Sequence, residues 1–320
     1  MSPDPTPRPP RLLLLDSASL YFRAFYGVPD QRRSPDDPPT NAVRGFLDMI
    51  ATLVTTHRPT HLVACWDNDW RPQFRVDLIP SYKTHRVAAD ATVEGAGVPE
   101  AVPDDLAPQV PVIVDALAAL GIARAGADGF EADDVIGTLV ERYRSRLPVD
   151  VVTGDRDLFQ LVDDAAPVRV LYTARTGVRD AEPIDQAALL SRYAVRTGDA
   201  YADMSILRGD TSDGLPGVAG IGEKTAAQLI EGYGSLVGLR AAVDSGDPAL
   251  KGARRTRLEE AAAYLDVAPR VVRVARDAPV PEVDPALPTQ VADARLLSEV
   301  ASTYGLTGVV NRVLSALGLG

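Results

Sequence analysis

The sequence is poor in cysteine, in histidine and in long apolar runs, and each shortage excludes a class of protein. Its 320 residues include one cysteine, Cys65, so no internal disulfide can form and a reducing compartment is the natural setting. The three histidines, His57, His61 and His85, show no metal-ligand spacing such as HExxH and are interpreted as structural or surface residues. No apolar stretch reaches the roughly 18 residues of a membrane span, and residues 12–15 are too short for a signal peptide. We therefore expect a cytoplasmic protein with no membrane contact.

Three enzyme classes are disfavoured because their motifs are missing. There is no G-x-S-x-G nucleophile elbow, which counts against a Ser-His-Asp hydrolase. There is no G-x-x-x-x-G-K-[ST], which excludes an ATP-binding P-loop. An aspartyl phosphotransferase beginning at Asp16 would need a second acid two residues later, where the chain has Ala18.

Short apolar runs alternate with helical patterns in the first half of the chain. The strand-like runs are 11–16, 61–67, 149–157 and 168–172. The helical patterns are 41–55, 106–120 and 132–146. This alternation predicts an α/β fold with a mostly parallel sheet, in which ligands bind beyond the carboxyl ends of the strands. Three of the strand-like runs end in aspartate and would deliver it to that edge.

Changes in composition predict the domain organisation. Residues 1–10 are rich in proline and are expected to be a disordered tail. Residues 11–185 would form the α/β core, with a polar insertion at about 70–108 that is typical of a lid or binding loop. Residues 186–318 are expected to form a mainly helical module, because glycine, alanine and leucine recur there at helical spacing.

Nine carboxylates lie in short motifs that such a fold would bring together. They are Asp16, Asp67, Glu131, Asp133, Asp134, Asp155, Asp157, Asp210 and Asp213. Taken singly, several could simply be helix caps. Taken together, they cannot all stay ionised without raised pKa values or bound cations. Oxygen ligands without histidine or cysteine favour Mg²⁺ or Mn²⁺, and two such ions roughly 3.5–4 Å apart suit in-line phosphodiester hydrolysis.

The charge balance agrees with one acidic site in an otherwise mixed surface. A net charge of −11 and a pI near 4.8, taken alone, argue against nucleic acid as a partner. Leaving out the nine acids changes the net charge from −11 to −2 (−11 + 9), so much of the acidity would belong to the metal site.

Two motifs could hold a phosphate backbone. WRPQFRVDLIPSYKTHR (70–86) mixes cations with aromatic residues that could stack on unpaired bases, although a solvated amphipathic segment would look the same. LPGVAGIGEKTAAQLI (215–230) is a helix-hairpin-helix pattern, in which small residues and helix N-terminal amides bind phosphate without reading sequence. A plain helical packing element is the alternative. KGARRTR (251–257) either extends this backbone track or is a charged helix face.

The chain contains, in this order, the motifs LLLLD, CWD, FR…SYK.HR, GFEADDV, TGDRDLFQL and GDTSDGLPGVAGIGEKTA. In the order of these motifs the chain resembles the bacterial 5′→3′ exonuclease and flap endonuclease family over about residues 11–310. That family includes the N-terminal nuclease domain of DNA polymerase I, and this chain resembles its free-standing relatives. The resemblance implies a PIN-like sheet nuclease core, a helical arch over the active site and a helix-three-turn-helix module that grips duplex DNA. It also implies DNA replication or repair as the setting.

The resemblance also implies roles for individual residues. The first metal cluster would be Asp16, Asp67, Glu131, Asp133 and Asp134, and the second Asp155, Asp157, Asp210 and Asp213. The arch motif would comprise Phe74, Arg75, Tyr82, Lys83 and Arg86, and its cations would steady the scissile phosphate. The backbone-binding hairpin would comprise Gly217, Gly220, Gly222, Lys224 and Thr225, with a K⁺ ion bound there.

The implied activity is metal-dependent hydrolysis of DNA at 5′ flaps, overhangs and nicks by a monomer that uses two or more Mg²⁺ or Mn²⁺ ions. A polymerase or a ligase as protein partner is left open. Two departures from the family stand out. Gly214 occupies a position where many members have asparagine, which predicts a looser loop after Asp213, and the acidic segment 87–105 predicts weaker DNA threading or a changed substrate choice.

Two rival functions remain at this point. A non-catalytic DNA-binding scaffold would not need the carboxylate cluster. An RNase of the broader nuclease superfamily would not need the glycine hairpin. The full set of acids and the hairpin together favour the DNA nuclease.

Overall fold

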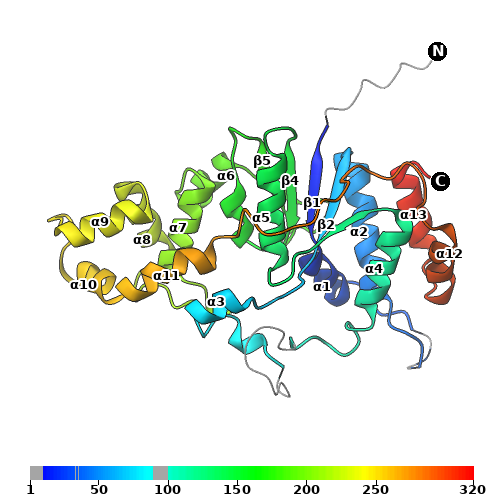
Figure 1. Cartoon of the computed structure of the whole chain (residues 1–320), viewed down its shortest axis with the longest axis horizontal. Helices are drawn as coiled ribbons and strands as arrows, with labels where there is room; N and C mark the ends of the chain where they lie inside the picture. Colours follow the sequence, from blue (N-terminus) through cyan, green and yellow to red (C-terminus); the bar gives the residue numbers. More distant parts are fainter. Residues whose placement is uncertain (1–9, 33, 35, 89–99) are drawn as a thin grey trace, which may run out of the picture.

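The computed structural model describes residues 10–32, 34, 36–88 and 100–320, and it contains one six-stranded sheet (Figure 1). The strands are β1 (Leu12–Asp16), β2 (His61–Cys65), β3 (Ala123–Ala125), β4 (Val149–Thr153), β5 (Val168–Tyr172) and β6 (Glu182–Ile184). Their order is β3-β2-β1-β4-β5-β6, and every pair is parallel except β5 with β6. The predicted α/β fold with a mostly parallel sheet is confirmed. The three-residue strands β3 and β6 were not predicted, because they are too short to show a pattern.

Helices cover both faces of the sheet. They are α1 (Ser17–Gly27), α2 (Asn41–His57), α3 (Gln73–Leu78), α4 (Gln109–Leu120), α5 (Ala132–Tyr143), α6 (Gln186–Tyr193), α7 (Gly198–Arg208), α8 (Glu223–Tyr233), α9 (Leu236–Ser245), α10 (Gly252–Glu260), α11 (Ala262–Val272), α12 (Ala294–Thr303) and α13 (Thr307–Leu317). Short 3₁₀ helices are η1 (Thr84–Arg86), η2 (Asp157–Leu161) and η3 (Thr211–Asp213). No helix in the described ranges is long and apolar enough to cross a membrane.

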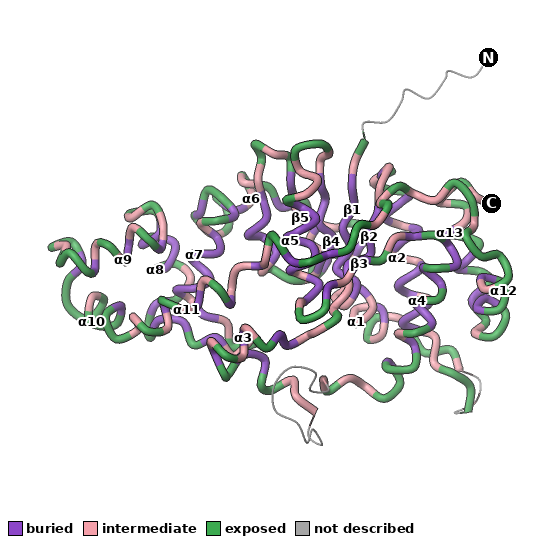
Figure 2. Tube along the Cα trace, in the orientation of Figure 1, coloured by how far each residue is buried: buried purple, intermediate pink, exposed green. Residues whose placement is uncertain are grey.

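Alternate residues of β1 pack into two hydrophobic cores, one on each face of the sheet. Leu12 and Leu14 pack with α5 and with the helices α7 to α11, whereas Leu13 and Leu15 pack with α1, α2 and α4. Successive strand side chains point to opposite faces, so a strand with apolar residues at every position is buried on both sides. Figure 2 shows this buried centre between the exposed outer surfaces of the helices.

The region predicted as one helical module is divided between the two faces. Helices α7 to α11 extend away from the α5 side of the sheet, and the chain then runs back across the molecule to α12 and α13 (Figure 1). These last two helices bury Leu297, Val300 and Val313 against the core formed with α2 and α4. The sequence could not indicate this return, because amphipathic helices do not specify which apolar face they cover.

The insertion after β2 forms α3 and η1, and α3 packs against α11. Residues 89–99, most of the predicted acidic segment 87–105, lie outside the described residues. The described part of the insertion brings the Ser81-to-Arg86 stretch against the loop that contains η3.

Candidate metal centre

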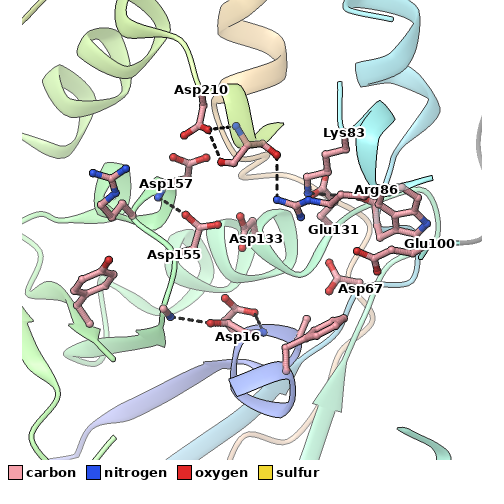
Figure 3. Close-up of a pocket in the computed structure, with 18 residues that line it drawn as sticks. Asp16, Asp67, Lys83, Arg86, Glu100, Glu131, Asp133, Asp155, Asp157 and Asp210 are labelled. Carbon is pink, nitrogen blue, oxygen red and sulfur yellow. Dashed lines mark hydrogen bonds and ion pairs between the residues drawn. The ribbon is translucent and has the colours of Figure 1, made fainter. Parts of the chain in front are cut away.

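A cavity of about 360 Å³ lies at the carboxyl edge of the sheet, and eight of the residues that line it are acids (Figure 3). Seven of the nine predicted carboxylates line it: Asp16, Asp67, Glu131, Asp133, Asp155, Asp157 and Asp210. They come from the ends of β1, β2 and β4, from the start of α5 and from the loop before η3. Parallel strands place the residues that follow them at one edge, so segments almost 200 residues apart meet here.

The acids at the centre of the sheet are held by helix N-termini and by a strand hydroxyl. Asp16 caps α1 by accepting from the Ser19 amide at 3.1 Å, and its other oxygen accepts from Thr153 Oγ1 at 2.6 Å. Asp67 accepts from the Ala132 amide at the start of α5 at 2.7 Å. Each carboxylate is therefore oriented by a donor that leaves further oxygen lone pairs for the cavity.

Burial and mutual repulsion disfavour the ionised form of these central acids. Burial raises the pKa of Asp16 to about 7 despite its hydrogen bonds, and the charges of Asp67 and Asp155 add to the rise. Burial also raises the pKa of Asp67 to about 6, with Glu131 contributing. The pKa of Asp133 is raised by burial and then by Asp16 and Asp155. Carboxylates with such raised pKa values release protons readily when cations bind beside them.

A second group of acids lines the opposite wall of the cavity. Asp155 Oδ1 accepts from the Asp157 amide at 2.9 Å where β4 passes into η2. Burial raises the pKa of Asp157, and the neighbouring charges of Asp155, Asp213 and Asp210 raise it further. Asp210 accepts from the Ser212 amide at 2.8 Å and from the Ser212 hydroxyl.

On the insertion side, in contrast, the acids are paired with buried cations. Arg75 makes two 2.7 Å hydrogen bonds to Asp134 and one of 3.2 Å to Glu131. Lys83 forms an ion pair with Glu131, and the Tyr82 hydroxyl donates to the same carboxylate at 2.7 Å. Burial alone would lower the pKa of Lys83, but the combined interactions with Glu131, Tyr82 and Asp213 outweigh burial and the pKa is raised. Lys83 therefore stays charged beside the cavity.

Two of the nine predicted metal ligands do not face the cavity. Asp134 is fully buried, binds Arg75 and accepts from the Ala275 amide at 2.7 Å. It follows Asp133 directly on α5, and adjacent helical residues point in different directions. Asp213 binds Arg86 at 2.9 Å and lines a smaller void that shares Asp133 and Asp157 with the cavity.

The aromatic members of the arch motif are used in packing. Tyr82 is 4% exposed, and Phe74 packs on Phe130 with ring centroids 5.8 Å apart. Arg75 is 3% exposed and also donates to the Val271 carbonyl at 2.9 Å. None of these three side chains lines the cavity: Arg75 and Tyr82 line a smaller neighbouring void, and they act on the cavity through Glu131. Arg86, whose side chain is 37% exposed, does line the cavity.

Several cavity residues were missed by sequence reasoning. Thr153 orients Asp16 and ends the β4 run, so its position after an apolar strand was an available signal. Phe22, Glu100, Arg156 and Tyr172 line the cavity itself, whereas Thr153 acts on it only through Asp16. Glu100 belongs to the acidic segment that the sequence placed in the insertion, and nothing in the pattern singled it out.

The carboxylate oxygens of the cavity fit a divalent cation that keeps part of its hydration shell better than a cation fully enclosed by protein ligands. Within the ranges that the structure describes, no three acidic, histidine or cysteine side chains are set to hold an ion directly. The acids of the cavity nevertheless offer oxygen ligands without histidine or cysteine, and burial together with neighbouring charges raises the pKa values of Asp133 and Asp157. Mg²⁺ commonly keeps several waters and binds through one or two carboxylates, so a wide carboxylate-lined cavity suits it.

The glycine hairpin lies on the helical side of the molecule. Gly217 and Gly220 have φ of +63° and +68°, and Gly222 is the N-cap of α8. Lys224 is exposed in the first turn of that helix, and the guanidinium of Arg257 lies against Gly220. The arrangement offers helix N-terminal amides beside exposed cations, which suits a phosphate.

Comparison with sequence families gives two adjoining matches. The 5′-3′ exonuclease N-terminal resolvase-like domain matches residues 11–194, and the 5′-3′ exonuclease C-terminal SAM fold matches residues 196–295. A 5′-3′ exonuclease of Streptomyces coelicolor is 57% identical over 305 residues, which cover 95% of this chain and 99% of the relative. A 5′-3′ exonuclease of Mycobacterium tuberculosis is 52% identical over 96% of this chain and 97% of the relative.

Two further comparisons place the fold. DNA polymerase I of Mycobacterium bovis is 42% identical over 74% of this chain, which corresponds to 24% of the polymerase. A bacteriophage T5 flap endonuclease crystallised with DNA and metal ions has a TM-score of 0.62 at 16% identity and covers 96% of this chain and 99% of its own. At that identity the likeness shows a shared fold.

Proposed function

Because the chain belongs to the 5′-3′ exonuclease family, we propose that it is a structure-specific DNA nuclease that cuts at 5′ flaps, overhangs and nicks with the help of two or more Mg²⁺ or Mn²⁺ ions. The observation that carries the proposal is a cavity lined by eight acids, several of which form no ion pair with any residue that the structure describes. The two 5′-3′ exonuclease relatives support the 5′ to 3′ direction.

The acids of the cavity would hold the ions. Asp16, Asp67 and Asp133 would serve one position, and Asp155, Asp157 and Asp210 the other. When bound, the ions would lower the pKa of an attacking water and stabilise the charge on the leaving oxygen. Asp134 and Asp213 would act as positioning residues, because their carboxylates are engaged by Arg75 and Arg86.

The carboxylates also control when DNA can enter. A phosphate backbone is repelled by an uncompensated cluster of acids, so productive binding requires that cations neutralise the cavity first. DNA binding at this site would therefore depend on divalent ions, before any phosphodiester bond is cut. The arch cations Lys83 and Arg86 would then contact the scissile phosphate from the side opposite Asp155 and Asp157 (Figure 3).

Duplex DNA would be held at a distance from the cavity by the hairpin before α8. Its amides, Lys224 and Thr225 contact phosphate oxygens without reading bases, so recognition follows the shape of the DNA. A K⁺ ion at this hairpin, a monomeric state and a polymerase or ligase partner stay predictions of the resemblance.

The test is the double variant Asp155→Ala with Asp157→Ala, assayed on a 5′-labelled DNA flap in Mg²⁺. We expect cleavage to be lost while the protein stays folded, because the variant removes repulsion between buried acids. Asp244→Ala, an exposed acid on α9, is the control and should cleave at the wild-type rate. Cleavage by the double variant at the wild-type rate would refute the proposal. A matched panel of DNA, RNA and hybrid flaps then decides between a DNA nuclease and an RNase.

A further inference from the structure

The base of the insertion is fastened to the loop of the second acid group by four hydrogen bonds. The Lys83 amide donates to the Asp213 carbonyl at 3.0 Å, and Ser81 Oγ donates to the Gly214 carbonyl at 2.7 Å. Arg86 donates to the Ser212 carbonyl at 3.3 Å and to Asp213 Oδ1 at 2.9 Å. These contacts join segments more than 120 residues apart in the chain. We call them the 81–214 latch.

Gly214 makes this close approach possible. Its φ is +71°, a conformation that side chains rarely adopt, and a Cβ atom there would overlap the carbonyl oxygen of Ser81. The loop after Asp213 is therefore held tightly against the insertion, and the predicted looser loop is not what the structure shows. A residue with a Cβ atom in this backbone conformation would force the two backbones apart.

Lys83 is held in an unfavourable backbone conformation at the same place. Its φ is +49°, and it is one of three such residues other than glycine in the described part of the chain. A conformation of this kind persists only where the surroundings enforce it. The bond from the Lys83 amide to Asp213 is one such constraint, and it directs the lysine side chain towards Glu131.

We propose that Gly214 and Ser81 are positioning residues, which fix the arch cations Lys83 and Arg86 relative to the acids of the cavity. The inference rests on the proposed nuclease function and deepens it. One side of the latch carries Lys83 and Arg86, and the other side continues from Asp210, which lines the opposite wall. Loosening the latch lets the cations move away from the acids. The hairpin that holds duplex DNA is left unchanged, so turnover is affected more than binding.

The principal test is Gly214→Asn beside the matched control Gly305→Asn. Asparagine tolerates positive φ better than most residues, so both variants carry a similar backbone cost. Gly305, in the turn between α12 and α13, has φ of +63° and no atom within 4 Å of a Cβ built on it. The two variants therefore differ in the overlap with Ser81.

Two readouts are measured on each variant. The first is hydrogen–deuterium exchange at the Lys83 amide in protein free of metal and DNA, which reports the latch without activity. The second is kcat and KM on a DNA flap. For Gly214→Asn we expect exchange about tenfold faster and kcat about tenfold lower with KM within about twofold, which corresponds to one well-formed interaction. Gly305→Asn should match the wild type in both.

Ser81→Ala provides the second variant, because it removes one latch bond without adding bulk. We expect about a threefold loss in kcat, and Ser81→Thr, which keeps the hydroxyl, should restore it. Unchanged exchange at Lys83 in Gly214→Asn, or a loss carried by KM with kcat unchanged, would overturn the inference. Flap cleavage by the wild type is measured separately. A result that contradicts the role of the 81–214 latch therefore leaves the proposed nuclease function untouched.

Discussion

The two walls of the cavity use the same residue type in opposite ways. On the insertion side, Glu131, Asp134 and Asp213 are bound by Lys83, Arg75 and Arg86. Across the centre and the far wall, five acids have no ion pair among the described residues. They are Asp16, Asp67, Asp133, Asp155 and Asp157. The ninth predicted acid, Asp210, lines the cavity but lies 3.8 Å from the guanidinium of Arg208, so it belongs with the paired acids. The nine acids look alike in the sequence, and the fold divides them into four paired and five unpaired residues.

The difference teaches which acids are available to bind ions. A buried carboxylate with an arginine partner has its charge compensated, and removing either partner would leave an uncompensated buried charge. A buried carboxylate among other carboxylates is a cost to the folded protein until a cation arrives, as the raised pKa values of Asp16 and Asp67 indicate. Variants of the two sets should therefore separate activity from stability.

The largest effect is expected when an unpaired acid is removed. Asp133→Asn should lower flap cleavage by about a thousandfold or more, because several kcal/mol of transition-state stabilisation depend on the bound ions. The metal-free variant should unfold at a higher temperature than the wild type, because one repelling charge is gone. Asp128→Asn, an exposed acid in the preceding loop, is the control for both readouts. A stable Asp133→Asn protein with wild-type cleavage would remove Asp133 from the unpaired, ion-binding set.

The second prediction concerns a paired acid. Asp134→Asn should destabilise the protein by about 3–5 kcal/mol, because it leaves the buried Arg75 without its main partner. Chemical denaturation in the absence of divalent ions measures this change. If Asp134→Asn instead kept full stability and lost activity as Asp133→Asn does, pairing would not distinguish the two sets.

The third prediction is a dependence of stability on pH that opposes the usual behaviour of carboxylates. The folded-state pKa values of Asp16 and Asp67 lie at about 7 and 6, above the value near 3.8 expected when unfolded. The folded state therefore holds more protons between about pH 4 and pH 7, and this contribution to stability is lost as the pH rises through that window. Metal-free protein should lose about 1–3 kcal/mol between pH 5 and pH 8.

Thermal unfolding with a chelator present checks the pH effect, and added Mg²⁺ should restore stability at pH 8. The Asp133→Asn variant should show a smaller fall with pH, because one contributor to the repulsion is absent. Metal-free protein that becomes more stable from pH 5 to pH 8 would contradict the description of the cavity acids.

The smallest effect is expected at the hairpin, away from both walls. Lys224→Gln should weaken duplex binding only a few-fold and reduce the slope of log K against log salt by about 0.9, the value for one phosphate contact. Arg295→Gln, an exposed cation on α12, is the matched control and should leave the slope unchanged. An equal change in both variants would show that only overall charge is being measured.

The sequence predicted the sheet and the convergence of the acids, because strands without polar positions and aspartates at their ends carry that information locally. The strand that ends at Asp16 and the helix that begins at Ala132 could be predicted without knowing any tertiary contact. The features that could not be predicted depend on the direction in which a side chain points and on contacts with residues far away in the sequence. Asp133 and Asp134 look equivalent in sequence, yet one faces the cavity and the other faces Arg75, which is 59 residues away.

Other features depended on contacts that leave no local signal. Gly214 could be identified as a departure from the family, but its contact with Ser81 exists only in the folded chain. Tyr82 sits in an aromatic and basic motif typical of nucleic-acid binding, and the fold directs its hydroxyl to Glu131. Composition and spacing do not show on which side of a short loop a side chain will lie.

The measurement that tests the central claim most directly is anomalous scattering from crystals soaked in manganese. The division into paired and unpaired acids predicts Mn²⁺ between Asp16, Asp67 and Asp133 and a second ion towards Asp155 and Asp157, with none at Asp134. Anomalous peaks absent from this cavity, or found only beside the paired acids, would contradict it.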